Sequence, residues 1–275
     1  MTSLALRPVR LAVPAIAELV GRQRTLAVYG LALLALALLA VTMQAVDPRT
    51  LASGVSVWAK PAKFLSSVGI FALTFAWFFG YVRPERRCSQ PMRGTVAALL
   101  LAGSFELAWI VWQGANGLES HFNFDTILYR RMFDLMGLFA VMLLATALPL
   151  AWEIARRPAA GLRGDFAAAV AIGLVLAFLL GGSFGGAIAA NGGAAVGPQA
   201  GGLPLFGWNR AGGDLRIAHF VGIHAMQAIP IAAALVAGLG PRLRWTAVVG
   251  GAALYVALSL ALYAQAAAGR PLFPL

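Results

Sequence analysis

The sequence contains a single cysteine, Cys88, and charged side chains make up only 11% of its 275 residues. One thiol cannot form an internal disulfide bond, and the chain has no Cys-x-x-Cys pair for zinc, an iron–sulfur cluster or covalent haem attachment. A phosphate-binding P-loop is also missing. The sequence therefore gives no motif-based support for thiol or nucleotide chemistry.

Apolar residues are abundant instead: 60% of the chain is hydrophobic, and the mean hydropathy is +0.81. A soluble domain of this length cannot hide so much apolar surface in one core, so lipid is the expected second solvent and partner. The net charge of +11 would suit a nucleic-acid partner, but the basic residues are scattered between apolar runs and form no stripe. The composition predicts an integral membrane protein that does not bind nucleic acid.

Uncharged stretches long enough to cross a bilayer predict an all-α, polytopic fold with seven transmembrane helices in one domain, residues 1–275. The predicted spans cover residues 25–46, 64–82, 95–116, 132–152, 166–187, 217–238 and 245–267. Residues 1–23 are predicted to form an interfacial helix before the first span. Residues 188–216, which are rich in glycine, are predicted to form an outer loop.

The basic residues also predict an orientation, because cytoplasmic loops carry an excess of Arg and Lys. With the N-terminus in the cytoplasm and the C-terminus outside, thirteen of the 21 basic residues fall on the cytoplasmic side. These are Arg7, Arg10, Arg22, Arg24, Arg83, Arg86, Arg87, Arg93, Arg156, Arg157, Arg163, Arg242 and Arg244. Together with the arginine-rich composition, this pattern predicts a multi-pass protein of the inner (plasma) membrane of a bacterium.

Polar side chains inside the predicted spans follow helical stripes. Glu106 lies near the middle of the third span and shares one face with Gly103 and Gln113. On the sixth span, a continuous helix would place four polar side chains within an arc of about 140°. These four are Arg216, His219, His224 and Gln227. Such residues either hydrogen-bond neighbouring helices and hold the bundle together, or line a wet cavity.

Further polar residues gather in the predicted outer loops. Lys60 and Lys63 stand at the start of the second span, and a charged segment follows the third. That segment contains His121, Asp125, Arg130, Arg131 and Asp134. All three histidines fall on the outer side in this topology. We therefore predict an outer-face pocket formed by the second, third and sixth spans and able to bind an anionic or amphiphilic small molecule.

The leading functional hypothesis is a membrane enzyme that binds haem b, a divalent metal, a quinone or an anionic lipid. The candidate catalytic residues are Glu106, His121, Asp125 and His224. The candidate cofactor-binding residues are His219, His224, Arg216, Lys60 and Lys63, and the candidate metal ligands are His121, His219 and His224. Two alternatives stay open: a proton-coupled transporter that uses Glu106, and a non-catalytic subunit or scaffold with membrane-complex partners.

Overall fold

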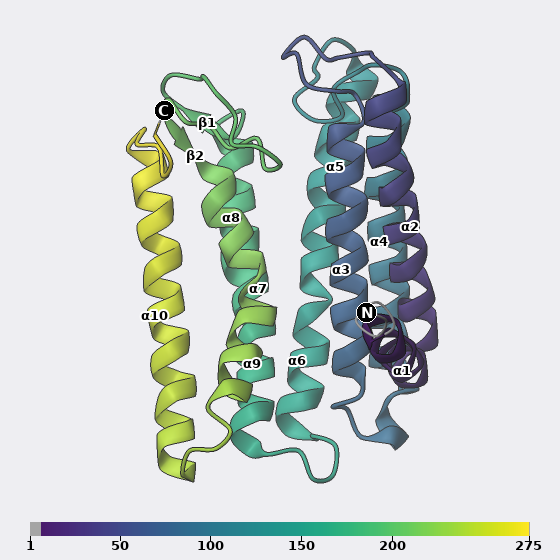
Figure 1. Ribbon diagram of the computed structural model, residues 1–275, viewed down its shortest axis with the longest axis vertical. Helices are drawn as coiled ribbons and strands as arrows, with labels where there is room; N and C mark the ends of the chain where they lie inside the picture. Colours follow the sequence, from purple (N-terminus) through teal and green to yellow (C-terminus); the bar gives the residue numbers. More distant parts are fainter. Residues whose placement is uncertain (1–6, 275) are drawn as a thin grey trace, which may run out of the picture. The chain divides into compact units, whose positions relative to one another are not determined.

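The computed structural model describes the backbone of residues 7–274 and the side chains of residues 14–274 (Figure 1). The chain is mostly helical and divides into two compact units, which meet in the sequence between Thr146 and Ala147. Each unit has its own core and is described by itself. The predicted interfacial segment 1–23 corresponds to a helix from Arg7 onward, and its first six residues lie outside the described range.

Unit 1 is a bundle of helices with one short 3₁₀ turn. Its elements are α1 (Arg7–Arg22), α2 (Arg24–Val46), α3 (Ala59–Phe79), η1 (Pro84–Arg86), α4 (Gln90–Ala115) and α5 (Ile127–Ala145). Local chemistry sets several ends: Asp47 caps α2 and precedes a proline, Pro91 occupies the first turn of α4, and the side chain of Thr126 caps α5. Each apolar run thus becomes a helix with a defined start and stop.

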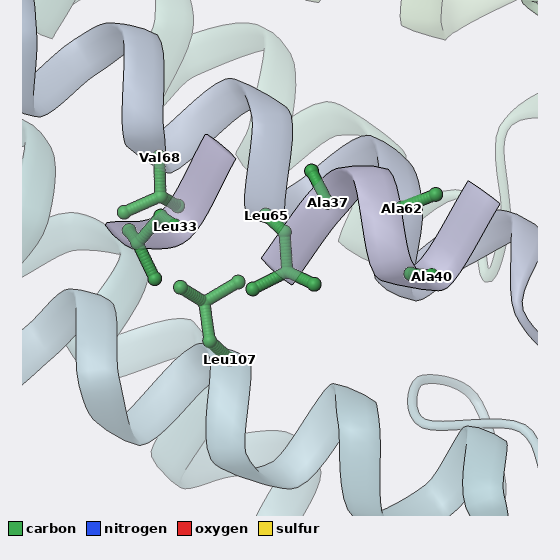
Figure 2. Close-up of a cluster of buried hydrophobic side chains, with 7 residues drawn as sticks. All are labelled: Leu33, Ala37, Ala40, Ala62, Leu65, Val68 and Leu107. Atoms are coloured by element: carbon green, nitrogen blue, oxygen red, sulfur yellow. The ribbon is translucent and has the colours of Figure 1, made fainter. Parts of the chain in front are cut away.

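The core of unit 1 forms where α2, α3 and α4 meet (Figure 2). Its buried side chains are Leu33, Ala37, Ala40, Ala62, Leu65, Val68 and Leu107. Alanines let α2 and α3 approach closely, and two glycines, Gly30 and Gly69, lie against each other at this contact. A Cβ atom built on Gly30 would lie 2.9 Å from the carbonyl oxygen of Gly69. Small residues at this crossing are therefore a packing requirement.

Unit 2 is also helical, with a small strand pair in one loop. Its elements are α6 (Ala147–Arg156), α7 (Gly164–Ala190), β1 (Ala195–Val196), β2 (Gly213–Asp214), α8 (Leu215–Ile223), α9 (Ala225–Leu235) and α10 (Pro241–Ala267). Helix α7 packs against α8, α9 and α10, and two apolar clusters form between these helices. The strands β1 and β2 pair antiparallel within the predicted glycine-rich loop, which is not helical between α7 and α8.

Six helical segments within residues 7–274 are long and apolar enough to cross a membrane, and a bent pair gives a seventh candidate. The six are Arg24–Val46, Ala59–Phe79, Gln90–Ala115, Ile127–Arg156, Gly164–Ala190 and Pro241–Ala267. Each predicted span other than the sixth overlaps one of these segments, within a few residues at most ends. The apolar runs therefore predict where the long helices lie.

The predicted sixth span, residues 217–238, is not one continuous helix. It breaks at His224 into α8 and α9, whose axes differ by 53°. Pro230 lies inside α9 and cannot donate the backbone hydrogen bond that a regular helix requires. The helical arc that was predicted to unite Arg216, His219, His224 and Gln227 assumed an unbroken helix, so that prediction was wrong in its geometry.

Candidate functional site

The loop between α2 and α3 is fixed by a carboxylate at its start. Asp47 accepts hydrogen bonds from Nη2 of Arg49 and Nε1 of Trp58, each at 2.7 Å. The bonds from Arg49 and then Trp58 hold the pKa of Asp47 well below its usual range. Arg49 also donates from Nη1 to the carbonyl oxygen of Ala115, 3.0 Å away at the end of α4. These contacts place the first turn of α3 beside the end of α4.

The loop that follows α4 folds back onto that helix. Nε1 of Trp109 donates to the carbonyl oxygen of Ser120 at 3.1 Å, and Nε2 of Gln113 donates to that of Glu119 at 3.4 Å. His121 comes next in the sequence, with its ring centroid 6.0 Å from the ring of Phe64 on α3. Two side chains of one helix thus position the histidine against the start of another.

Lys60, Ser120 and His121 meet at one atom. Nζ of Lys60 and Oγ of Ser120 each lie 3.1 Å from Nδ1 of His121. An ammonium group has only donors, so Nδ1 accepts from a charged Lys60 and the ring proton is assigned to Nε2. Burial, and then the positive charge of Lys60, lower the pKa of His121 to about 3. His121 is therefore a neutral acceptor at physiological pH.

This arrangement predicts a pH effect on stability. Between the ordinary pKa of 6.5 and the folded-state pKa of about 3, the unfolded chain binds a proton at His121 that the folded chain does not. The contribution of His121 to the free energy of unfolding is thus complete above pH 6.5 and is lost as the pH falls through that window. For each pH unit of acidification in this window, we expect the free energy of unfolding of the His121→Gln variant to fall by roughly 1 kcal/mol less than that of wild type. Unfolding in detergent at a series of pH values checks this, and equal slopes would contradict it.

Glu106 lies on α4 in the interior of unit 1, with 4% of its surface exposed. Gly103 and Gln113 are buried as well, so the predicted stripe on this helix is an inward face. Oε1 of Glu106 has no hydrogen-bond partner among the described residues, and the carboxylate interacts electrostatically with Lys60. Buried polar atoms are normally hydrogen-bonded. A buried carboxyl group with an unpartnered oxygen, on an apolar helix, is therefore the feature of this unit that most needs a function.

The other residues predicted for the pocket on this part of the chain lie at the surface. Lys63, Asp125, Arg131 and Asp134 are exposed, and Arg130 lies 5.9 Å from the ring centre of Phe124. Lys63 is one helical turn from Lys60 but points away from the interior. Of the two predicted lysines, Lys60 belongs to the candidate site, because its Nζ atom contacts His121.

The predicted residues of unit 2 have structural partners. His219 hydrogen-bonds through Nδ1 to the carbonyl oxygen of Gly181 at 2.9 Å, which ties α8 to α7. Nδ1 of His224 lies 3.2 Å from Oε1 of Gln227, at the break between α8 and α9. These contacts favour the interpretation that both histidines stabilise helix packing.

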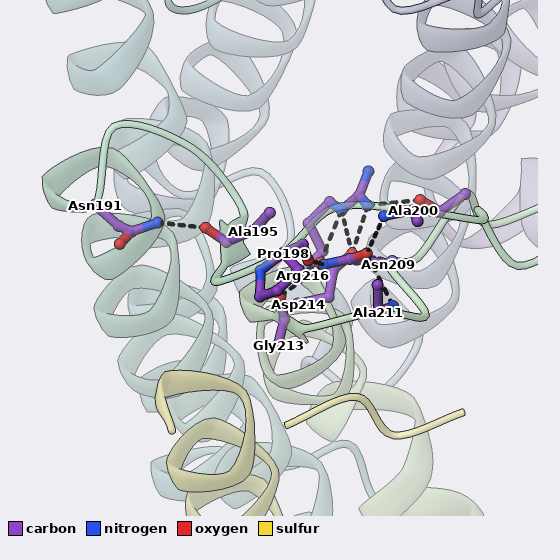
Figure 3. A network of polar contacts seen from close by, with 10 residues as sticks. Asn191, Ala195, Pro198, Ala200, Asn209, Ala211, Gly213, Asp214 and Arg216 are labelled. Atoms are coloured by element: carbon purple, nitrogen blue, oxygen red, sulfur yellow. Dashed lines mark hydrogen bonds and ion pairs between the residues drawn. The ribbon is translucent and has the colours of Figure 1, made fainter. Parts of the chain in front are cut away.

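Arg216 belongs to a polar network that organises the glycine-rich loop (Figure 3). Its guanidinium group bonds to the buried carboxylate of Asp214, which also accepts the backbone N–H of Asn209 at 2.8 Å. The side chain of Asn209 in turn bonds to the carbonyl oxygen of Pro198 at 2.8 Å. Arg216 therefore neutralises the buried carboxylate of its own loop, and this ion pair gives the positive charge of Arg216 a structural role.

The candidate metal ligands do not gain support. Within the described part of the chain, no group of three or more His, Cys, Asp or Glu side chains is arranged to hold a metal ion. His121 belongs to unit 1, whereas His219 and His224 belong to unit 2. The predicted pocket draws on both units and stays a prediction.

Sequence reasoning missed the residues that support the site. Asp47 and Arg49 were not predicted to take part, although an acid followed by proline at the end of an apolar run marks a cap and a turn. Ser120 adjoins His121 in the sequence but was not among the predicted site residues. No sequence signal shows that its hydroxyl group would share Nδ1 with Lys60.

The apolar helices support placing this chain among the multi-pass helical membrane proteins. Comparisons with protein-family models, curated proteins and solved structures give no match. Any more specific function therefore rests on the chemistry of unit 1.

Proposed function

We propose that this chain is a proton-coupled membrane transport protein and that Glu106 is the residue that carries the proton. The observation that supports the proposal is the buried carboxyl group of Glu106, whose Oε1 atom has no partner in the described structure. Ionisable groups inside membrane-spanning helices are costly, and proton pathways are one of their main uses. A carboxyl group fixed by several hydrogen bonds would exchange its proton less readily.

Lys60 and His121 have distinct roles in this proposal. When Glu106 releases its proton, the charge of Lys60 compensates the carboxylate, and when Glu106 takes up a proton that compensation is no longer needed. His121 stays neutral and accepts a hydrogen bond from Lys60 through Nδ1. It is therefore a positioning residue that keeps the ammonium group near α4.

Proton flux into proteoliposomes tests the proposal. A potassium diffusion potential drives protons inward, and a pH-sensitive dye trapped inside reports them. We expect Glu106→Gln to lower the flux by about tenfold or more, because an amide cannot exchange a proton. Glu85→Gln, which changes an exposed acid of the same unit, should keep the wild-type flux. Equal flux in the wild type and Glu106→Gln would contradict the proposal.

The orientation of the chain is part of the same proposal. A cytoplasmic N-terminus places thirteen of the 21 basic residues inside, and it puts the segment between α3 and α4 in the cytoplasm. The loop that holds His121 would then lie outside, so Lys60 and His121 would face the side from which protons enter a bacterial cell.

Cys88 provides a direct test of orientation, because it is the chain's single cysteine and is exposed between α3 and α4. A membrane-impermeant maleimide should leave Cys88 unlabelled in intact cells and label it once the cells are permeabilised. The double variant Cys88→Ser/Ala52→Cys moves the thiol to the exposed loop before α3 and should show the opposite pattern. Labelling of the wild-type protein in intact cells would show that the orientation is opposite to the proposed one.

The remaining hypotheses stay predictions. They are a membrane enzyme that binds haem, a metal, a quinone or an anionic lipid, and a non-catalytic subunit of a membrane complex. A visible spectrum of the purified protein separates the first of these, because non-covalent haem b gives an intense Soret band. Such a band would replace the transport proposal with a redox function.

A further inference from the structure

A hollow of about 570 Å³ opens in unit 1 near the end of α3, away from the Glu106 site. One wall is α1 between Pro14 and Arg22, and the other includes Gly80 and Arg87. Two arginines therefore line a concave surface where an apolar helix ends.

Arg22 is held rigidly in its wall. Its Nη1 atom donates to the carbonyl oxygen of Trp77 at 2.9 Å, and Nε donates to Glu18 at 2.8 Å. The guanidinium carbon lies 3.9 Å from the centre of the Trp77 ring, which adds a cation–π contact. These two hydrogen bonds use two of the five N–H donors of the guanidinium group.

Arg87 is fixed in a similar way on the opposite wall. Its Nε atom donates to the carbonyl oxygen of Val82 and Nη2 donates to that of Gly80, each at 3.0 Å. Both carbonyls belong to the turn that follows α3. The two bonds again use two of five donors, so the guanidinium group retains capacity for an anion.

The aromatic residues beside the hollow indicate its depth in a membrane. Nε1 of Trp77 donates to the hydroxyl group of Tyr81 at 2.8 Å, and the apolar helix α3 ends between them at Phe79. Tryptophan and tyrosine are enriched where the hydrocarbon core meets the lipid headgroups. This aromatic pair therefore favours a position of the hollow at the level of the lipid phosphates.

We propose that this hollow binds the phosphate group of an anionic phospholipid. Two preorganised guanidinium groups suit a lipid phosphate, because Arg can contact it through paired donors. Glu18 offsets one of the two positive charges, which leaves the lining with net positive charge. The proposal does not depend on Glu106 or on proton transport.

Native mass spectrometry of the purified protein with added phosphatidylglycerol or phosphatidylcholine tests this site. We expect phosphatidylglycerol to be retained preferentially, and Arg87→Gln to lower its retention by about tenfold. Arg93→Gln removes an exposed arginine of the same unit that does not line the hollow, so it should bind as wild type does. If both variants lost phosphatidylglycerol equally, the binding would depend on the general surface charge and not on this hollow, and the proposal would be overturned.

Two further arms keep the result decisive. Glu18 is half exposed, so Glu18→Gln should fold normally even if Arg87→Gln does not. It removes the opposing charge and should raise phosphatidylglycerol retention several-fold; unchanged or lower retention would overturn the proposal. Inorganic phosphate should compete only weakly, whereas full competition would assign the hollow to free phosphate and exclude the lipid.

Discussion

Replacing Lys60 with methionine is expected to lower the free energy of unfolding by about 2 kcal/mol. Lys60 donates to Nδ1 of His121, and its positive charge interacts with Glu119 and then with the buried Glu106. Methionine has nearly the same length but can do neither. Without Lys60, a charged Glu106 would lie uncompensated in an apolar interior, or Glu106 would have to keep its proton.

The measurement is equilibrium unfolding of the purified variant in mixed micelles, with Lys63→Met as the matched control. Lys63 is exposed on the same helix, so its replacement should change stability by about 0.5 kcal/mol or less. In the double variant Lys60→Met/Glu106→Gln the cost should fall well below the sum of the single changes, because no charge remains to be compensated. Additive costs would show that the two residues do not act on each other.

Replacing Gly30 with alanine is expected to cost about 2 kcal/mol, although alanine is the better helix former. A methyl group there would lie 2.7 Å from Cγ of Leu73 and 2.9 Å from the backbone oxygen of Gly69. The backbone contact cannot be relieved by a rotamer change, so α2 and α3 would have to move apart. The core in Figure 2 depends on that approach.

Gly137→Ala is the control for this second prediction. A Cβ atom on Gly137, in the middle of α5, meets nothing within 4 Å. We expect that variant to be as stable as wild type or slightly more stable, since only helix propensity changes. If both glycine variants have the same free energy of unfolding, the contact between α2 and α3 is not tight.

The positions of the long helices could be predicted because an apolar run of sufficient length has few alternatives to a helix in lipid. The break at His224 could not, because residues 217–238 contain no Asp, Glu, Lys or Arg and Pro230 lies six residues further on. Periodicity gives the face of a residue only while the helix continues. The four polar residues of the sixth span were predicted to share one face. In the structure, Arg216 and His219 have partners outside the four, whereas His224 and Gln227 contact each other.

The sequence predicted several residues of the candidate site but not the contacts between them. Lys60, Glu106 and His121 were all selected from the sequence as polar groups near or within apolar runs. The sequence did not distinguish Lys60 from Lys63, because that choice depends on α3 starting at Ala59 and on its rotation against α4. The loop contacts of Asp47 and Ser120 join residues far apart in sequence or depend on one hydroxyl rotamer, so pattern alone could not reveal them.

The most direct test of the central claim is an infrared difference spectrum of the reconstituted protein between acidic and alkaline buffer. A buried carboxyl group that exchanges its proton gives a C=O stretching band at a higher frequency than carboxyl groups in water. We predict such a band in wild type and in Glu85→Gln, and its loss in Glu106→Gln. A wild-type spectrum without the band, or a band that persists in Glu106→Gln, would contradict proton exchange at Glu106.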